Sequence, residues 1–209
     1  DPGYLSATVS FLGKIYQDYP DDQIREVCQS SIKTCSYFAY PNGFYGGSIG
    51  SRNTLHFYPH GFEIFGSEFP LAQTVAEKML HGLKEGKIVP PSIMSDRYLF
   101  YRVPEFLQSY IDFSERTKDM EKLPSQSDSL YKYFPIAKIW AKSDRNNYII
   151  VNAAKGGVVK VFDKNNNKLI VNDCGIIGQL RSGKIISSQW IDESYEIIQD
   201  EDSCKIVGR

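Results

Sequence analysis

Apolar side chains in the first forty residues recur at the three-to-four-residue spacing of two amphipathic helices. The first stripe consists of Leu5, Val9, Leu12 and Tyr16. The second stripe consists of Ile24, Cys28, Ile32, Cys35 and Ala39. Only a short segment around Pro20-Asp-Asp22 separates them, so the pattern predicts two antiparallel helices in a hairpin.

Further helices are predicted up to about residue 115. Ser67 has the character of an N-cap, and Pro70 suits the first turn of a helix that ends at Gly86. Its apolar stripe consists of Leu71, Val75, Met79 and Leu83. After Pro90-Pro91, the pattern predicts two separate helical pieces at about 95–102 and 104–114, with Pro104 in the first turn of the second piece.

The hydrophobic period changes to that of strands after residue 131. The strand-like segments, about seven in number, are 136–141, 148–152, 158–162, 168–172, 184–191, 195–199 and 205–207. Short strands separated by turns indicate an antiparallel β-sandwich or curved sheet. Residues 116–130 are charged and serine-rich, as in a linker. The sequence therefore predicts a multidomain α+β protein with a helical part at 1–115, a linker at 116–130 and an antiparallel β-sandwich-like domain at 131–209.

Composition excludes some functions but does not fix the compartment. The net charge is −1 and the basic residues are scattered, so the footprint of a nucleic-acid binder is missing. The sequence has no apolar run of the roughly 18 residues that a membrane helix needs. Cys28 and Cys35 would lie about 10.5 Å apart along one helix, too far for a disulfide. Pairing of Cys174 with Cys204 stays open, and the spacing of the cysteines matches no structural zinc site.

Residues 42–63 combine the residue types that carry chemistry. This segment holds two of the three histidines of the chain, His56 and His60, together with an arginine, asparagines, tyrosines and a glutamate. Five glycines interrupt it and permit tight turns. Polar, glycine-broken loops on a rigid scaffold are where binding and catalytic groups concentrate.

Several motifs of the chain resemble the heparinase II/III-like family. The segments similar to the toroid of that family are Asp1-Pro-Gly-Tyr4, Phe44-Tyr-Gly-Gly47, Gly50-Ser-Arg-Asn53 and Tyr58-Pro-His-Gly-Phe-Glu63. The segments similar to the start of its β-sandwich are 148–158 and Asn172-Asp-Cys-Gly175. The resemblance implies a partial α/α toroid followed by a β-sandwich, and cleavage of uronate-containing polysaccharides by β-elimination. Four or five helices cannot close a toroid, so we expect a fragment of a longer protein.

β-Elimination next to a carboxylate requires a group that neutralises the carboxylate, a base for the α-proton and an acid for the leaving oxygen. Arg52 and Asn53 suit the first task, His56 or His60 the second, and Tyr58 or Tyr45 the third. The candidate catalytic residues are His56, His60 and Tyr58. The candidate substrate-binding residues are Arg52, Asn53, Tyr45 and Glu63. This chemistry needs no metal or cofactor, and the expected partner is an acidic polysaccharide or oligosaccharide.

Each of these residues also has a structural interpretation. His60 could hydrogen-bond a backbone carbonyl at a helix start, and His56 could lie on the surface. Arg52 could pair with Glu63 or another glutamate, and Tyr45 could pack beneath the loop. The chain also departs from the family pattern, because family lyases usually bring a further histidine from the β domain and no histidine follows His81 here.

Three functions remain as hypotheses. The first is a polysaccharide lyase that acts on an acidic glycan, and the alternative is a non-catalytic glycan-binding or scaffold protein with a lyase-like fold. The third is a glycoside hydrolase or epimerase that uses Glu63 as an acid. Hydrolysis usually needs two carboxylates across the scissile bond, which ranks this third hypothesis last.

Overall fold

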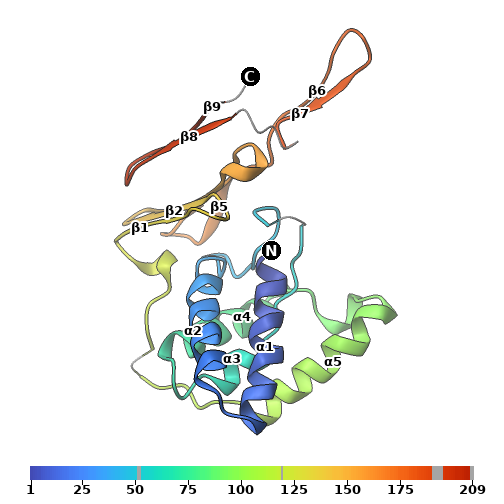
Figure 1. Cartoon of the computed structure of the whole chain (residues 1–209), viewed down its shortest axis with the longest axis vertical. Coiled ribbons are helices and arrows are strands. Elements are labelled where there is room, and N and C mark those ends of the chain that lie inside the picture. The colour runs from blue at the N-terminus through green and yellow to red at the C-terminus, as the bar shows by residue number, and fades with distance from the viewer. Residues whose placement is uncertain (51–52, 119, 190–194, 208–209) are drawn as a thin grey trace. The chain divides into compact units, whose positions relative to one another are not determined.

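The computed structural model describes residues 1–50, 53–118, 120–189 and 195–207 (Figure 1). The chain forms two compact units, which we describe separately. The helical unit comprises Asp1–Gly47 and Thr54–Pro124, and the β unit comprises Ser48–Asn53 and Ser125–Arg209. Helices followed by an antiparallel sheet confirm the predicted α+β class.

The helical unit begins with the predicted hairpin. Its helices are α1 (Pro2–Asp18), α2 (Asp22–Ser36), α3 (His60–Ile64), α4 (Pro70–Lys84) and α5 (Asp96–Ile111), with a short 3-10 helix η1 (Pro91–Ile93) before α5. Aspartate caps start both hairpin helices, because Asp1 Oδ1 accepts from Gly3 N at 2.9 Å and Asp21 Oδ1 accepts from two amides of α2. None of the helices among the described residues is long and apolar enough to cross a membrane.

The short helix α3 packs closely against α1. A Cβ on Gly61 would lie 2.5 Å from the carbonyl carbon and oxygen of Val9, so only glycine fits there. The Ser10 hydroxyl accepts a hydrogen bond from Gly61 N at 3.0 Å. This contact fixes the position of α3, and with it the segment that leads into α3 and carries His56 and Tyr58.

We expect Gly61→Ala to destabilise the helical unit by about 2 kcal/mol, because backbone of α1 would have to move. Chemical denaturation followed by circular dichroism measures this change. Gly13→Ala is the matched control: its Cβ would meet the end of the Ile64 side chain at 3.2 Å, and alanine favours the helix interior. Equal stability loss in both variants would contradict the prediction.

Two predicted helix boundaries were wrong. The N-cap of α4 is Phe69 rather than Ser67, and the chain forms one helix α5 where we predicted two pieces. Pro104 lies inside α5 and removes the amide that would bond the carbonyl of Phe100. Residue Phe100 is 79% exposed, so water can reach this turn of the helix and the proline does not end it.

The β unit is built on an antiparallel meander with the order β1-β2-β3-β4-β5. Its strands are β1 (Ser129–Phe134), β2 (Ile139–Asp144), β3 (Asn147–Asn152), β4 (Val158–Asp163) and β5 (Lys168–Asp173). Two hairpins follow, β6 (Ile177–Gln179) with β7 (Ile185–Ser187) and β8 (Glu196–Gln199) with β9 (Cys204–Val207). The predicted antiparallel pairing is confirmed. The strand predicted from residue 136 begins at Ile139 instead, because Ile136 lies in a turn in which Lys138 has a φ of 50°.

Polar side chains attach other segments to the meander. Lys155 Nζ donates to the carbonyls of Ser48 and Gly50 at 3.0 and 2.9 Å, and the Asn152 amide donates to the carbonyl of Ile49. The loop Ser48–Asn53 therefore belongs to the β unit rather than to the helices that flank it in sequence. The β8–β9 hairpin is held to β2, where Trp140 Nε1 donates to the Asp200 carbonyl at 3.0 Å.

All four cysteines are free. This confirms the prediction for Cys28 and Cys35, which are buried in α2, and it leaves Cys174 exposed. Burial raises the pKa of Cys28 to about 11 and that of Cys35 to about 12, so both stay protonated at neutral pH.

We expect iodoacetamide at pH 8 to modify Cys174 in the folded protein before it modifies Cys28 or Cys35. The reagent needs an accessible thiolate, and the two cysteines of α2 offer neither accessibility nor charge. Peptide mass spectrometry over a time course measures the order, and urea serves as the control because unfolding should make all four thiols reactive. Modification of Cys35 before Cys174 in the absence of denaturant would contradict the burial of the Cys35 side chain in α2.

Candidate functional site

The segment 54–59 brings the candidate residues of the helical unit against α1 and α5. Two serines of α1 hold its backbone: Ser6 Oγ accepts from Tyr58 N, and Ser10 Oγ donates to the Tyr58 carbonyl, both at 3.2 Å. Because these contacts fix the backbone on both sides of Tyr58, the side chains of Tyr58 and its neighbour His56 have defined positions.

His56 is half-buried and lies against the start of α5. Its ring stacks on Tyr98, with ring centroids 4.8 Å apart and an interplanar angle of 25°. The buried Nδ1 atom has no hydrogen-bond partner within the described part of the chain. Burial, and secondarily the positive charge of Arg102, lower the pKa of His56 below 6.5. At neutral pH the imidazole is therefore neutral and can accept a proton.

Tyr58 lies beside the same arginine. Its ring centroid is 4.3 Å from the guanidinium carbon of Arg102, and Phe11 of α1 packs edge-on against it. Burial is the main cause that raises the pKa of Tyr58 above 10. The hydroxyl therefore keeps its proton at neutral pH and can donate it.

Arg102 is a fully buried side chain of α5 that sequence reasoning missed. Its guanidinium lies between the rings of Tyr58 and Phe106, and Nη2 donates to the Phe57 carbonyl. Nε and Nη1 are buried without a hydrogen-bond partner among the residues described. Desolvation lowers the pKa of Arg102, but an arginine remains charged in proteins. The sequence feature that could have identified Arg102 is the charged pair Arg102 and Glu105 in an otherwise apolar stretch of α5.

His60 has a different environment from His56. It is 1% exposed, and its Nε2 atom lies 2.5 Å from Asp112 Oδ2 at the end of α5. Its backbone amide donates to Glu105 Oε1 at 3.1 Å, and Glu105 Oε2 also binds Lys14 Nζ at 2.8 Å. The ring pairs with a carboxylate and not with a backbone carbonyl. His60 was one of the two histidines expected to act as the base; the structure buries it where α3 meets α5.

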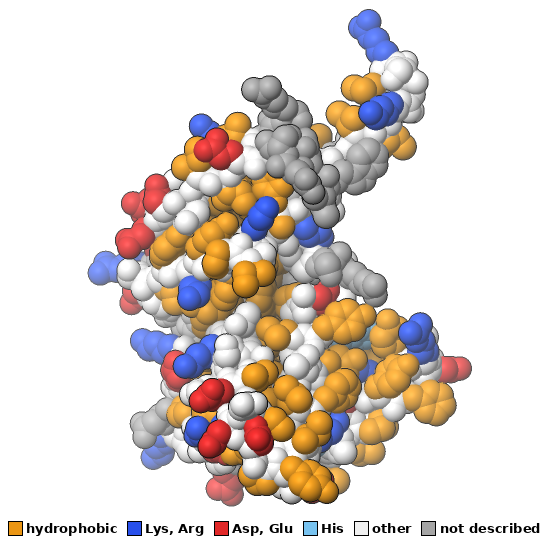
Figure 2. Space-filling model, in the orientation of Figure 1, with side chains coloured by type: hydrophobic (Ala, Val, Ile, Leu, Met, Phe, Trp, Pro, Cys, Tyr) orange, Lys and Arg blue, Asp and Glu red, His pale blue; other side chains and the backbone are white. Residues whose placement is uncertain are grey.

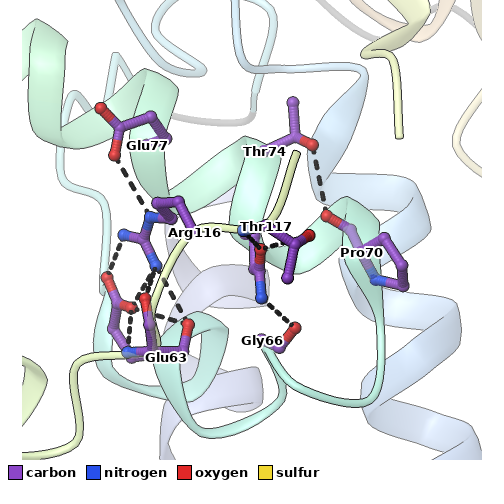
Figure 3. Close-up of polar contacts among 9 residues, drawn as sticks. Glu63, Gly66, Pro70, Thr74, Glu77, Arg116 and Thr117 are labelled. Carbon is purple, nitrogen blue, oxygen red and sulfur yellow. Dashed lines mark hydrogen bonds and ion pairs between the residues drawn. The ribbon is translucent and has the colours of Figure 1, made fainter. Parts of the chain in front are cut away.

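Two candidate substrate-binding residues are buried in the helical unit. Tyr45 is fully buried, and its hydroxyl donates to the Pro2 carbonyl at 3.0 Å, which supports the interpretation that it packs beneath the loop. Glu63 forms a two-pronged ion pair with Arg116, with distances of 2.6 and 2.7 Å (Figure 3). Both side chains therefore have structural partners within the helical unit.

The remaining two candidates, Arg52 and Asn53, fall in the segment assigned to the β unit. Asn53 is exposed and belongs to the β unit, and Arg52 lies outside the described residues. Within the helical unit, the structure brings His56 and Tyr58 together beside Arg102 of α5.

A pocket of about 750 Å³ opens elsewhere in the helical unit. Its lining is mostly apolar and comes from α3, α4, α5 and the segments beside them; it includes Phe57, Glu63, Met79, Phe106, Tyr110 and Ile111. Figure 2 shows hydrophobic side chains gathered on the surface over α5. Phe57, whose carbonyl accepts a hydrogen bond from Arg102, and Phe106, whose ring lies against the guanidinium, both line this pocket.

The described residues contain no cluster of histidine, cysteine, aspartate and glutamate that could hold a metal ion. Comparison of the chain with protein-family models, curated proteins and solved structures gave no significant match. The functional argument therefore depends on the chemistry of His56, Tyr58 and Arg102.

Proposed function

We propose that the protein is a carbohydrate-active enzyme, a polysaccharide lyase that cleaves an acidic, uronate-containing glycan by β-elimination. The observation that carries this proposal is the pair of His56 and Tyr58 beside one buried arginine. Their pKa values are shifted in opposite directions: burial keeps the histidine neutral and the tyrosine protonated. The resemblance to heparinase II/III-like proteins, with an α/α toroid and a β-sandwich, is part of the same proposal.

The proposed elimination step needs no redox partner and consumes no water. His56 takes the proton at C5 of the uronate, and the electron pair of that C–H bond becomes the C4–C5 double bond. The bond between C4 and the glycosidic oxygen breaks, and the departing oxygen takes the proton of the Tyr58 hydroxyl. Solvent then removes the proton from His56 and restores the proton of Tyr58. The products are a saturated sugar and an unsaturated uronate.

His60 has a positioning role in this proposal. Its ring is paired with Asp112 and its amide with Glu105, so it holds the start of α3 against α5. Because Ser10 of α1 contacts both Gly61 N and the Tyr58 carbonyl, the position of α3 is coupled to that of the proposed acid.

A non-catalytic glycan-binding or scaffold protein is the alternative function. The lack of any histidine after His81 favours it, since the β unit then supplies no imidazole. Incubation of the whole protein that carries this sequence with uronate polysaccharides separates the two functions. A lyase produces the ultraviolet absorbance of an unsaturated uronate, whereas a binding protein retains the glycan and produces none. Release of reducing ends without this absorbance would contradict β-elimination and indicate hydrolysis.

A further inference from the structure

We infer that Arg102 is the receptor for the carboxylate group of an acidic sugar. This inference deepens the proposed function and rests on it for the class of ligand. It assigns a residue of α5, outside the loop 42–63, as the group that selects acidic over neutral sugars.

Two donor atoms of the Arg102 guanidinium are buried without a hydrogen-bond partner among the described residues. Arg102 is fully buried and its Nη2 donates to the Phe57 carbonyl, yet within the part of the chain that the structure describes Nε and Nη1 have no hydrogen-bond partner. Buried N–H donors are normally paired, because an unpaired donor has lost its hydration and gained nothing in return. Nε and Nη1 are two such donors on one cation, so an acceptor with negative charge is the partner that their chemistry favours.

The acidic side chain of Glu105 near Arg102 is already bound to other groups. Tyr58 and then Glu105 are the acidic groups that influence the charge of Arg102, but the two carboxylate oxygens of Glu105 bind Lys14 and the amide of His60. Among the described residues, no ion pair joins Arg102 to a carboxylate. A ligand carboxylate would neutralise this buried cation, and neutralisation of the substrate carboxylate is what makes the adjacent proton acidic.

Two aromatic rings lie against the guanidinium of Arg102. The guanidinium carbon of Arg102 lies over the rings of Tyr58 and Phe106, 4.3 and 4.9 Å from their centroids. The N–H donors of a guanidinium lie in its plane. A planar carboxylate suits in-plane donors of this kind. The orphaned Nδ1 of His56 belongs to the same cluster, because the charge of Arg102 lowers the pKa of that histidine.

Access to these donors requires a side chain to move. Arg102 has no exposed surface, whereas Tyr98, which stacks on His56, is 40% exposed. The ring of Tyr98 covers the histidine from the start of α5, and rotation of this partly exposed tyrosine would uncover His56.

Calorimetric titration of the whole protein tests the assignment. The probes are an oligomer of glucuronate, an oligomer of mannuronate, and the same oligomers with their carboxylates reduced to alcohols. We expect wild-type protein to bind an acidic oligomer at least roughly 10-fold more tightly than its reduced counterpart, the scale of one charge-assisted contact. Arg102→Met should remove this preference. Arg97→Gln, which also removes one positive charge from α5, should leave it within about twofold.

Equal affinity of wild-type protein for the acidic and reduced oligomers would overturn the assignment, as would a preference that survives in Arg102→Met. Tighter binding of a sulfated neutral oligosaccharide than of either uronate would overturn the choice of carboxylate. If Arg102→Met does not fold, nitrogen-15 spectra of the wild-type protein replace it. The Nε signal of Arg102 should then shift with the acidic oligomer and stay unchanged with the reduced one, and an unchanged signal with both overturns the assignment.

The titration and the cleavage assay can fail separately. Binding that depends on Arg102 without formation of an unsaturated product supports the carboxylate receptor and contradicts the lyase. Formation of an unsaturated product at the same rate in Arg102→Met and wild type supports the lyase and contradicts the receptor.

Discussion

Tyr58→Phe and His56→Gln should each lower kcat on an acidic glycan by roughly 100-fold or more, the scale of a lost general acid or base. Phenylalanine keeps the ring that lies on Arg102 but removes the proton that the leaving oxygen requires. Glutamine keeps a polar side chain of similar length but cannot accept the C5 proton at neutral pH. The initial rate of formation of the unsaturated uronate measures both effects.

Tyr110→Phe is the matched control for these variants. Tyr110 is also in the helical unit, but its side chain is exposed and has no part in the proposed proton transfers. Loss of its hydroxyl should leave kcat within about twofold of wild type. Activity of Tyr58→Phe and His56→Gln within a few-fold of wild type would refute the assignment of acid and base.

The pH dependence of the same reaction follows from burial. Because the pKa of His56 is lowered below 6.5, the base is lost only when the pH falls below that value, and the rate should be level through neutral pH. The acid Tyr58 has a pKa raised above 10, so its deprotonation limits the rate only above pH 10. Tyr98→Ala should hydrate His56, stabilise its charged form and move the acidic limb upward toward pH 6.5. An acidic limb that stays in place in this variant would contradict the stacking of Tyr98 on the base.

Local patterns along the sequence were sufficient to predict most of the fold. The stripes that begin at Leu5 and Ile24, with the short segment around Pro20 between them, predicted α1 and α2, because helix periodicity acts between residues close in sequence. Pro104 was misjudged because its effect depends on whether water reaches the turn before it. The strand β1 was missed because its residues follow a serine-rich stretch, and its pairing with β2 is a tertiary contact.

The candidate site was less predictable, because burial decides what its residues do. His56 and His60 are four residues apart and share the same chemistry, yet one stacks on an exposed tyrosine and the other pairs with a carboxylate 52 positions away. Arg102 lies more than forty residues from either histidine. Only the packing of α5 against the segment before α3 brings it to them, and no local spacing encodes that contact.

Glu63→Gln should destabilise the helical unit by about 3 kcal/mol, the scale of breaking a buried ion pair. Glu63 is 6% exposed, and its carboxylate accepts two hydrogen bonds from Arg116 and another from the amide of Ser114. The glutamine amide removes the charge and places an N–H₂ group where two donors already point. The midpoint of urea unfolding, followed by the helical circular dichroism signal, measures the loss.

Glu77→Gln provides the control, because Glu77 binds the same arginine from a different environment (Figure 3). Its side chain is 45% exposed and its distance to Arg116 is 3.2 Å, so water competes with the ion pair and the expected cost is below about 1 kcal/mol. The ratio of the losses in unfolding free energy of the two variants tests the role of Glu63 without any knowledge of the ligand. A substrate-binding glutamate would instead give Glu63→Gln nearly wild-type stability and a weaker affinity for the glycan. Equal losses in the two variants would show that burial around Arg116 does not set the strength of this ion pair.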